Sequence, residues 1–323
     1  MRASETVFDN TQGKRQKGKG KREKAEGTRD EGKGIRDLRA YLALLRPANV
    51  ATALADVLAG YGVAGLGNPR ALPWLLGATA CLYAGGVVLN DFFDREIDRR
   101  ERPERPIPSG RVPAAHAAAL GGVLLVAGVL LAWQATTAAG WTALTIALLV
   151  LFYDAWGKRY FAIAPLNMGL CRASNLLLGM AAVPSALETS WALGFIPLSY
   201  IWAVTALSRG EVHGGDRRVA TAALLFLCGA IGALVAVTLR SGNSSFPGLA
   251  LAAALMWRVL PPFWRARQDP TPATIRTAVG RGVLSLVLVD AAIGAAYAGG
   301  PYAAIILAVG LVAGLLARMF AVT

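Results

Sequence analysis

The chain has 323 residues, of which 55% are hydrophobic and only 16% are charged. Its mean hydropathy of +0.46 lies well above that of ordinary soluble domains, so the composition excludes that class and indicates a polytopic membrane protein. The formal net charge is +13, but 12 of the 33 basic residues fall within the first 40 positions. No aromatic interleaving or fold signature accompanies this charge, so we expect no nucleic acid among the partners.

The first 38 residues are rich in lysine and glycine and contain few apolar side chains. Because such a segment cannot bury a core, the sequence predicts a disordered basic tail in the cytoplasm, followed by a membrane domain over residues 39–323. Contact of the tail with anionic lipid is the alternative. The tail contains no apolar stretch of the kind found in a cleavable signal peptide.

Ten apolar segments follow, each long enough to approach or span a hydrocarbon core of ~30 Å at ~1.5 Å per residue. They cover residues 42–66, 72–93, 113–135, 139–155, 165–186, 191–208, 218–239, 245–263, 278–298 and 301–321. The sequence therefore predicts an all-α fold, a bundle of about nine or ten transmembrane helices in contact with membrane lipid.

Basic residues are distributed unevenly among the loops between these segments. Sixteen Lys and Arg residues lie in one set of loops, at 94–112, 156–164, 209–218 and 258–281. The opposite set contains only Arg70 and Arg240. By the positive-inside rule, this bias predicts a multi-pass protein of the cell membrane whose two termini and 94–112 loop face the cytoplasm.

Acidic residues gather where the second apolar segment ends, in "LNDFFDREIDRRERPERPIPSGRV". If this helix continues past Asn90, then Asp91, Asp94 and Asp98 share one face at positions i, i+3 and i+7. Crowded carboxylates repel one another unless a hard cation lies between them. Mg²⁺ takes one or two carboxylates and leaves its other positions to water and phosphate oxygens.

The simpler interpretation is a charged loop in which Arg95, Arg99 and Arg100 neutralise these acids. The longer string favours the metal site, because N-D-x-x-D-x-x-x-D is followed by R-P-I-P-S-G from Arg105 to Gly110. This combination resembles the UbiA superfamily of intramembrane prenyltransferases. The stretches "LRPAN" and "YDAWGKR" extend the resemblance from about residue 40 to the last helix.

The resemblance implies a helical bundle that binds an isoprenyl diphosphate through Mg²⁺ at its cytoplasmic end, with the prenyl chain running between helices toward lipid. It makes Lys158 and Arg159 candidate clamps for the diphosphate, in the "YDAWGKR" stretch between the fourth and fifth segments. Anchoring at the membrane surface is the alternative for Arg159. The reaction ionises the allylic C–O bond, and positive charge stabilises the leaving diphosphate.

Most family members carry a second acidic motif after the sixth helix, with two aspartates four residues apart. The corresponding stretch here is "LSRGEVHGGDRR", in which Glu211 and Asp216 are five apart. Carboxylates at that spacing diverge on a helix, but three glycines indicate a loop. The resemblance makes both residues candidate ligands of a second Mg²⁺, with a surface ion pair as the alternative for Asp216.

The altered second motif and "GLCRASNLLLGM" most resemble the EboC subgroup of the UbiA superfamily. Arg172 lies inside an apolar segment, where an unpaired cation costs about 2.5 to 3.5 kcal/mol, so it should face a cavity or a partner. One interpretation is that Arg172, Asn175 and Asp56 line a substrate cavity. The other is a structural ion pair of Arg172 with Asp56 or Asp290.

Two functions remain open on the sequence. The first is a membrane prenyltransferase that moves an isoprenyl group from its diphosphate to an acceptor that the sequence does not identify. The second is a non-catalytic protein on the same scaffold that binds or transports lipid diphosphates. For the enzyme, the predicted catalytic residues are Asp91, Asp94, Lys158 and Glu211, and the predicted substrate-binding residues are Asn90, Arg105, Arg159, Arg172, Asn175 and Arg209.

Overall fold

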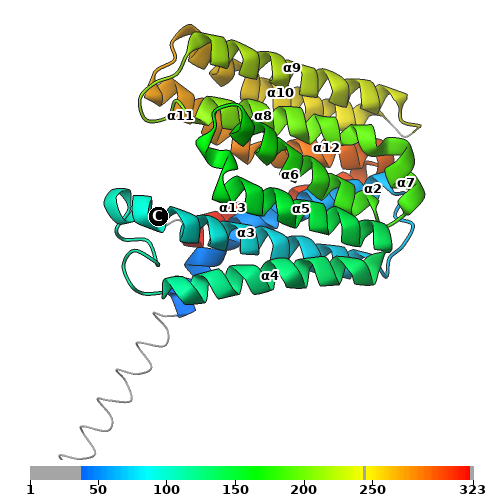
Figure 1. Ribbon diagram of the computed structural model, residues 1–323. Coiled ribbons are helices and arrows are strands. Elements are labelled where there is room, and N and C mark those ends of the chain that lie inside the picture. Colours follow the sequence, from blue (N-terminus) through cyan, green and yellow to red (C-terminus); the bar gives the residue numbers. More distant parts are fainter. Residues whose placement is uncertain (1–37, 243–244, 321–323) are drawn as a thin grey trace, which may run out of the picture.

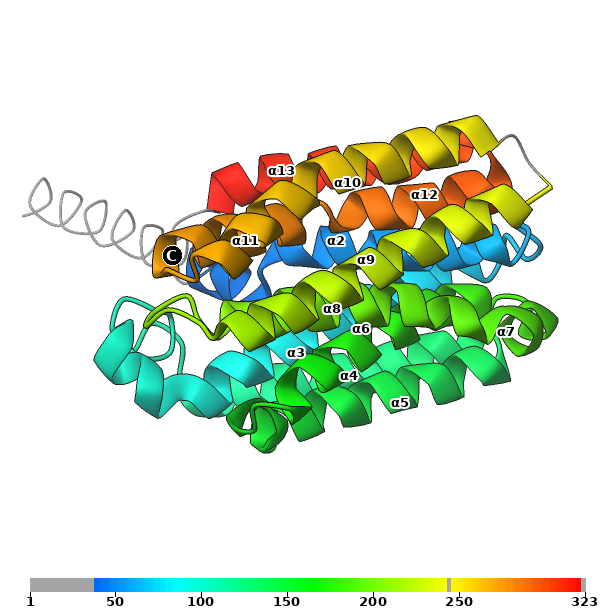
Figure 2. The same ribbon diagram turned by 90° about the horizontal axis from the view of Figure 1, so that it is seen from above.

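The computed structural model describes residues 38–242 and 245–320. Nearly all of the predicted basic tail lies outside these residues. The described chain is helical and contains no strand, and its helices run back and forth along one axis (Figures 1 and 2). The helices are α2 (Pro47–Val63), α3 (Leu72–Glu101), α4 (Ala114–Ala135), α5 (Thr137–Ala155), α6 (Ile163–Met180), α7 (Pro184–Ser190), α8 (Phe195–Ser208), α9 (Arg217–Arg240), α10 (Ser245–Gln268), α11 (Pro272–Leu284), α12 (Leu286–Ala298) and α13 (Gly300–Phe320).

Some passes through the bundle consist of two consecutive helices. Residues 38–45 are also helical and form one pass with α2. Helices α7 and α8 together form another pass, and so do α11 and α12. The described chain therefore crosses the bundle ten times. Eight passes are long and apolar enough to cross a membrane by length and composition. The other two are α6, which contains Arg172, and α13, whose apolar part is shorter.

The prediction of an all-helical bundle of about nine or ten helices is confirmed, and the chain is an integral, multi-pass membrane protein. Two details were wrong. The region 258–281, expected as a loop, is mostly helical, because α10 continues to Gln268 and α11 begins at Pro272. A helix break at Ser285 then divides the segment that was expected as a single helix.

Helix α2 lies at the centre, between α12 and α13 on one side and α3 and α6 on the other (Figure 2). Glycines allow it to approach α6 closely. A Cβ atom on Gly60 would lie 2.0 Å from the carbonyl oxygen of Leu176, and one on Gly179 would lie 2.1 Å from that of Val57. Small residues permit this approach in membrane proteins. The crossing fixes the spacing of two helices that carry polar groups into the core.

Helix α3 extends past the other helices to Glu101, which confirms the expected continuation through the acidic motif. The loop that follows folds back, and Ile107 and Val112 are buried against Val88 and Leu44. This loop, the α8–α9 loop and both ends of the described chain lie at the same end of the bundle (Figure 1). The charged segments singled out in the sequence therefore gather at one end.

We expect Gly60→Ala to lower the thermal unfolding temperature of the purified protein in detergent, because the added methyl group would force α2 away from α6. Overpacking of this kind costs about 1 to 3 kcal/mol or more. Gly122→Ala in α4 is the matched control, since its Cβ would meet no atom within 4 Å and alanine favours the helix. Equal unfolding temperatures for the two variants would contradict the close crossing.

Candidate active site

Two of the three carboxylates of the acidic motif are buried at the end of α3 and are held by basic side chains. Asp91 and Asp98 are each only 4% exposed. Arg105 bridges them, since its Nη1 lies 2.7 Å from Asp98 Oδ2 and 3.4 Å from Asp91 Oδ1. Arg46 Nη2 lies 2.5 Å from the same Asp91 oxygen. Two arginines from different segments, one just before α2 and one in the loop after α3, therefore neutralise this pair of acids.

The third carboxylate faces another part of the chain. Lys158 Nζ lies 2.6 Å from Asp94 Oδ1, which joins the turn after α5 to α3. The arginines expected to neutralise the motif do not contact these acids. Arg95 donates to the carbonyl oxygen of Phe92, and Arg99 pairs with Glu96 on the surface. The part of the simpler interpretation that assigned neutralisation to Arg95 and Arg99 is therefore wrong, since Arg46, Arg105 and Lys158 pair with these acids instead.

Arg46 reaches the motif because the backbone breaks at that residue. It adopts a left-handed conformation, with φ of 45°, between the helix at 38–45 and α2. The following Pro47 disfavours a helical conformation at Arg46, so the chain turns there and continues as α2. Arg46 was not among the predicted site residues, although the "LRPAN" stretch contained the signal.

The turn after α5 also contacts the loop after α8. Lys158 belongs to a short 3₁₀ turn, Gly157–Arg159, and its carbonyl oxygen accepts a hydrogen bond of 3.4 Å from Arg209 Nη1. The Arg209 guanidinium lies 5.3 Å from the centre of the Phe161 ring. Arg209 therefore links the second acidic motif to the first, while Arg159 is exposed.

The second acidic motif forms the expected loop. Asp216 is the N-cap of α9, where its Oδ1 accepts a hydrogen bond of 2.7 Å from the backbone N–H of Arg218. Arg276 donates to the carbonyl oxygen of Glu211 at 3.2 Å. Partial burial raises the pKa of Glu211 above its usual value, and the charge of Arg276 opposes this rise. The metal-binding role of both carboxylates stays a prediction.

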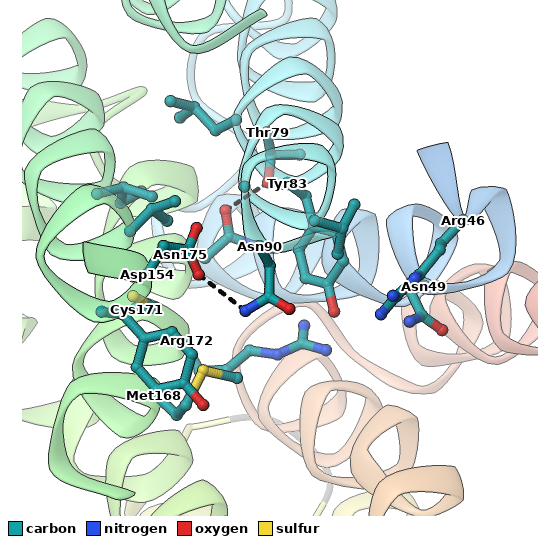
Figure 3. A pocket seen from close by; sticks show the side chains of 16 residues that line it. Arg46, Asn49, Thr79, Tyr83, Asn90, Asp154, Met168, Cys171, Arg172 and Asn175 are labelled. Atoms are coloured by element: carbon teal, nitrogen blue, oxygen red, sulfur yellow. Dashed lines mark hydrogen bonds between the residues drawn. The ribbon is translucent and has the colours of Figure 1, made fainter. Parts of the chain in front are cut away.

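A cavity of about 340 Å³ begins beside the motif and extends between α3, α5 and α6. Asn90 lies near its polar end, and Thr79 lies about 16 Å further along α3 at ~1.5 Å per residue. Its polar lining consists of Arg46, Asn49, Thr79, Tyr83, Asn90, Tyr153, Asp154, Cys171, Arg172 and Asn175 (Figure 3). Leucine, valine, isoleucine, methionine and glycine complete the wall. The cavity therefore joins a polar mouth to a largely apolar wall, with Thr79, Arg172 and Asn175 as polar groups further in.

Arg172 forms the expected structural ion pair and also lines the cavity, while its role toward a substrate stays a prediction. It forms a buried ion pair with Asp56, and its Nη2 lies 3.1 Å from Thr52 Oγ1. Asn175 donates to the same Asp56 oxygen at 2.9 Å, while its carbonyl oxygen accepts a hydrogen bond from Thr79 at 2.5 Å. Arg172 and Asn175 also line the cavity, whereas Asp56 is fully buried beneath them.

Asp154 is a cavity residue that the sequence analysis missed. It lies in the last turn of α5, is 3% exposed, and accepts a hydrogen bond of 2.9 Å from Asn90 Nδ2. Figure 3 shows the two side chains pointing toward each other. The signal was an acid four residues before Lys158 in "YDAWGKR", which a surface loop would explain equally well.

A family model described as the UbiA prenyltransferase family matches residues 50–276, most of the chain. The chain belongs to this family. Among curated relatives, a digeranylgeranylglyceryl phosphate synthase from Ignicoccus hospitalis is 37% identical over 178 residues, or 55% of this chain and 58% of the relative. One from Sulfurisphaera tokodaii is 33% identical over 180 residues, or 55% and 63%. Each match thus covers less than two thirds of the relative.

Solved structures of UbiA homologs share the fold. A structure of digeranylgeranylglyceryl phosphate synthase in membranes superposes with a TM-score of 0.65 at 22% identity, covering 81% of this chain and 98% of the other. A UbiA homolog from Archaeoglobus fulgidus bound to DMAPP and Mg²⁺ gives 0.58 at 16% identity, covering 78% and 98%. The resemblance to the superfamily is confirmed, and that to the EboC subgroup stays a prediction.

We expect Arg172→Met to destabilise the UbiA-family bundle strongly, because it leaves the Asp56 carboxylate buried without its cation. Breaking a buried pair in this way costs about 3 to 5 kcal/mol. The double variant Arg172→Met/Asp56→Leu should recover part of the loss, because no lone charge remains. Thermal unfolding of the single and double variants measures this coupling. The exposed Arg159→Met is the control, and strictly additive losses would contradict the ion pair.

Proposed function

We propose that this protein is a Mg²⁺-dependent prenyltransferase, which moves an isoprenyl group from an isoprenyl diphosphate to an acceptor. The observation that carries the proposal is the set of three α3 carboxylates, each paired with a cation, at the mouth of the cavity. A diphosphate is too polar for hydrocarbon and a prenyl chain is too apolar for water. A polar mouth on an apolar cavity suits both ends of such a substrate.

The chemistry of the motif fits magnesium. Asp91, Asp94 and Asp98 offer only carboxylate oxygens, the ligands that a hard cation prefers. Among the described residues, no group of three or more His, Cys, Asp or Glu side chains is arranged to hold a metal ion, and Arg105 lies between Asp91 and Asp98. Asp91, Asp94 and Asp98 would hold the ion together with diphosphate oxygens. Bound there, Mg²⁺ would supply positive charge next to the leaving group.

The basic residues would bind the diphosphate itself. Arg46, Arg105 and Lys158 would exchange their carboxylate partners for phosphate oxygens, and arginine suits phosphate because it donates two parallel hydrogen bonds. Arg209 reaches the same region through its bond to the Lys158 carbonyl group, and Arg159 is adjacent. Arg46, Arg105 and Lys158 are already paired with the α3 carboxylates. They would become available to bind the diphosphate only when a metal ion binds the carboxylates. Binding of the two should therefore be cooperative.

The relatives support this assignment by name. The curated relatives are named for synthesis of digeranylgeranylglyceryl phosphate, and one structural neighbour contains DMAPP and Mg²⁺. We extend donor and metal to this chain by proposal, and we leave the acceptor open. Arg172 and Asn175 would contact substrate deeper in the cavity, and Asn90 would do so at its mouth.

Glu211 is the stronger candidate of the second motif, in a catalytic as well as a metal-binding role. Its side chain is free for such a role because the contact with Arg276 uses its backbone carbonyl group. Asp216 would have to bind metal through its second oxygen, since the first caps α9. A second Mg²⁺ at this motif would have to lie near the first acidic motif. The hydrogen bond from Arg209 to the Lys158 carbonyl group brings the α8–α9 loop toward Asp94, the partner of Lys158.

We expect Asp94→Asn to abolish the Mg²⁺-dependent part of diphosphate binding while leaving thermal stability nearly unchanged. The amide removes one anionic ligand from a position that is partly exposed. Isothermal titration with geranylgeranyl diphosphate, with and without millimolar Mg²⁺, measures the effect. Glu96→Gln on the exposed side of α3 is the matched control. Equal Mg²⁺ dependence in Asp94→Asn and the parent would remove Asp94 from the site.

The same samples separate an enzyme from a binding protein. Incubation with isoprenyl diphosphates of graded length and lipid extract should release pyrophosphate and give a prenylated product detectable by mass spectrometry. Breaking the allylic bond requires stabilisation of charge that grows in the transition state, whereas binding does not. Tight diphosphate binding by the parent without pyrophosphate release would instead support the lipid-diphosphate binder or transporter.

We further propose that this end of the bundle faces the cytoplasm of the cell membrane, together with the N-terminus, because it carries most of the basic loops. In a variant that lacks Cys81, Cys171 and Cys228, we expect Pro103→Cys to react with impermeant maleimide only from the cytoplasmic side. Gly242→Cys, at the other end of α9, should react only from outside. Labelling of both from one side would refute this orientation.

A further inference from the structure

Asp154 has a carboxylate oxygen that the described structure leaves without a partner. Its Oδ1 accepts the hydrogen bond from Asn90, but its Oδ2 is buried and has no hydrogen-bond partner among the described residues. An unpaired buried carboxylate oxygen is costly, and such groups in native structures call for an explanation. Since Asp154 lines the cavity, a ligand in the cavity can supply the missing donor.

The other polar groups of the cavity wall are already engaged or cannot take a proton. Arg46 and Arg172 are cations paired with Asp91 and Asp56. The Asn175 carbonyl oxygen accepts from Thr79. Neutral tyrosine, cysteine and asparagine side chains are poor proton acceptors. Asp154 is the one carboxylate among the residues that line this cavity.

The position of Asp154 suits the transfer step. Its partner Asn90 directly precedes Asp91 on α3, and Lys158, one turn beyond Asp154, contacts Asp94. The proposed diphosphate site therefore borders Asp154 on two sides. A nucleophile bound to Asp154 would lie at the boundary between the diphosphate and the apolar interior, where the allylic carbon of the donor must also lie.

We infer that Asp154 binds the acceptor and takes its proton, an inference that rests on the proposed function. The acceptor then carries a neutral hydroxyl group. The acceptor oxygen forms a bond to the allylic carbon as the bond from that carbon to the diphosphate oxygen breaks. The electron pair leaves with the diphosphate, and the hydroxyl proton moves to Asp154 Oδ2. The missing partner of Asp154 Oδ2 is a hydrogen-bond donor, which a hydroxyl group supplies together with the transferable proton.

The test compares Asp154→Asn with the parent, using purified full-length protein in lipid nanodiscs. The donor is geranylgeranyl diphosphate with Mg²⁺, and the probe acceptors are a glyceryl phosphate that carries one geranylgeranyl chain and a free hydroxyl, its O-methyl ether, and lipid extract. General-base catalysis is typically worth about 10² to 10⁴ in rate. We expect kcat to fall by about that factor, with little change in diphosphate affinity, an ether product, and no product from the O-methyl probe.

Two further variants distinguish proton transfer from a structural role. Asp154→Glu should recover part of the rate, and formate should restore turnover to Asp154→Ala, because a small carboxylate can occupy the vacated space. If Asp154 only orients Asn90, then Asp154→Asn, whose amide oxygen can accept the same bond, will keep its rate, and formate will have no effect. Thr145→Ala, on the exposed face of α5, is the control for changes to this helix.

Each outcome bears on the inference. Parent-like turnover in Asp154→Asn, or a loss of diphosphate affinity as large as the loss of kcat, would overturn the assignment of Asp154 and leave the proposed function standing. A product joined through carbon would overturn the hydroxyl acceptor. Absence of transfer by the parent to every acceptor would overturn the proposed function, and the inference with it.

Discussion

Neutralisation of the α3 carboxylates is the interaction on which the polar end of this bundle depends. Asp91 and Asp98 are buried and Asp94 is partly exposed, and the chain supplies countercharges for the three acids from three separate segments. Each pairing also ties a segment to α3. The helix break before α2, the loop after α3 and the turn after α5 are all positioned by one cluster of ion pairs. The same ion pairs therefore neutralise the acids and hold these three segments against α3.

The cluster also explains how a charged site can exist before substrate arrives. Its acids and bases balance each other in the free protein, so the desolvation cost of each charge is offset by a partner. A substrate complex that brings both anion and cation can exchange these partners one for one without leaving any group bare. Under the proposed function, the site would therefore accept Mg²⁺ and diphosphate together, and neither ligand alone would replace all the lost ion pairs.

Sequence predicted the passes of the bundle well because hydropathy reports directly on membrane burial, and the bounds expected for α4 and α5 lie within two residues of those observed. It also predicted the acidic motif, whose spacing on a helix is a local property. It did not predict that Arg46 would reach Asp91, since a single left-handed residue leaves no trace in hydropathy. Asp154 was missed because its burial arises only when α5 packs beside α3.

The close crossing of α2 and α6 links packing to chemistry in this chain. Gly60 and Gly179 bear no functional group, yet the approach that they permit brings Asp56 within reach of Arg172 and Asn175. A side chain at either glycine would separate the helices and break several polar contacts at once. The buried polar contacts of α2 and α6 therefore depend on two positions that carry no side-chain chemistry of their own, and a substitution there would act on the cavity wall from behind.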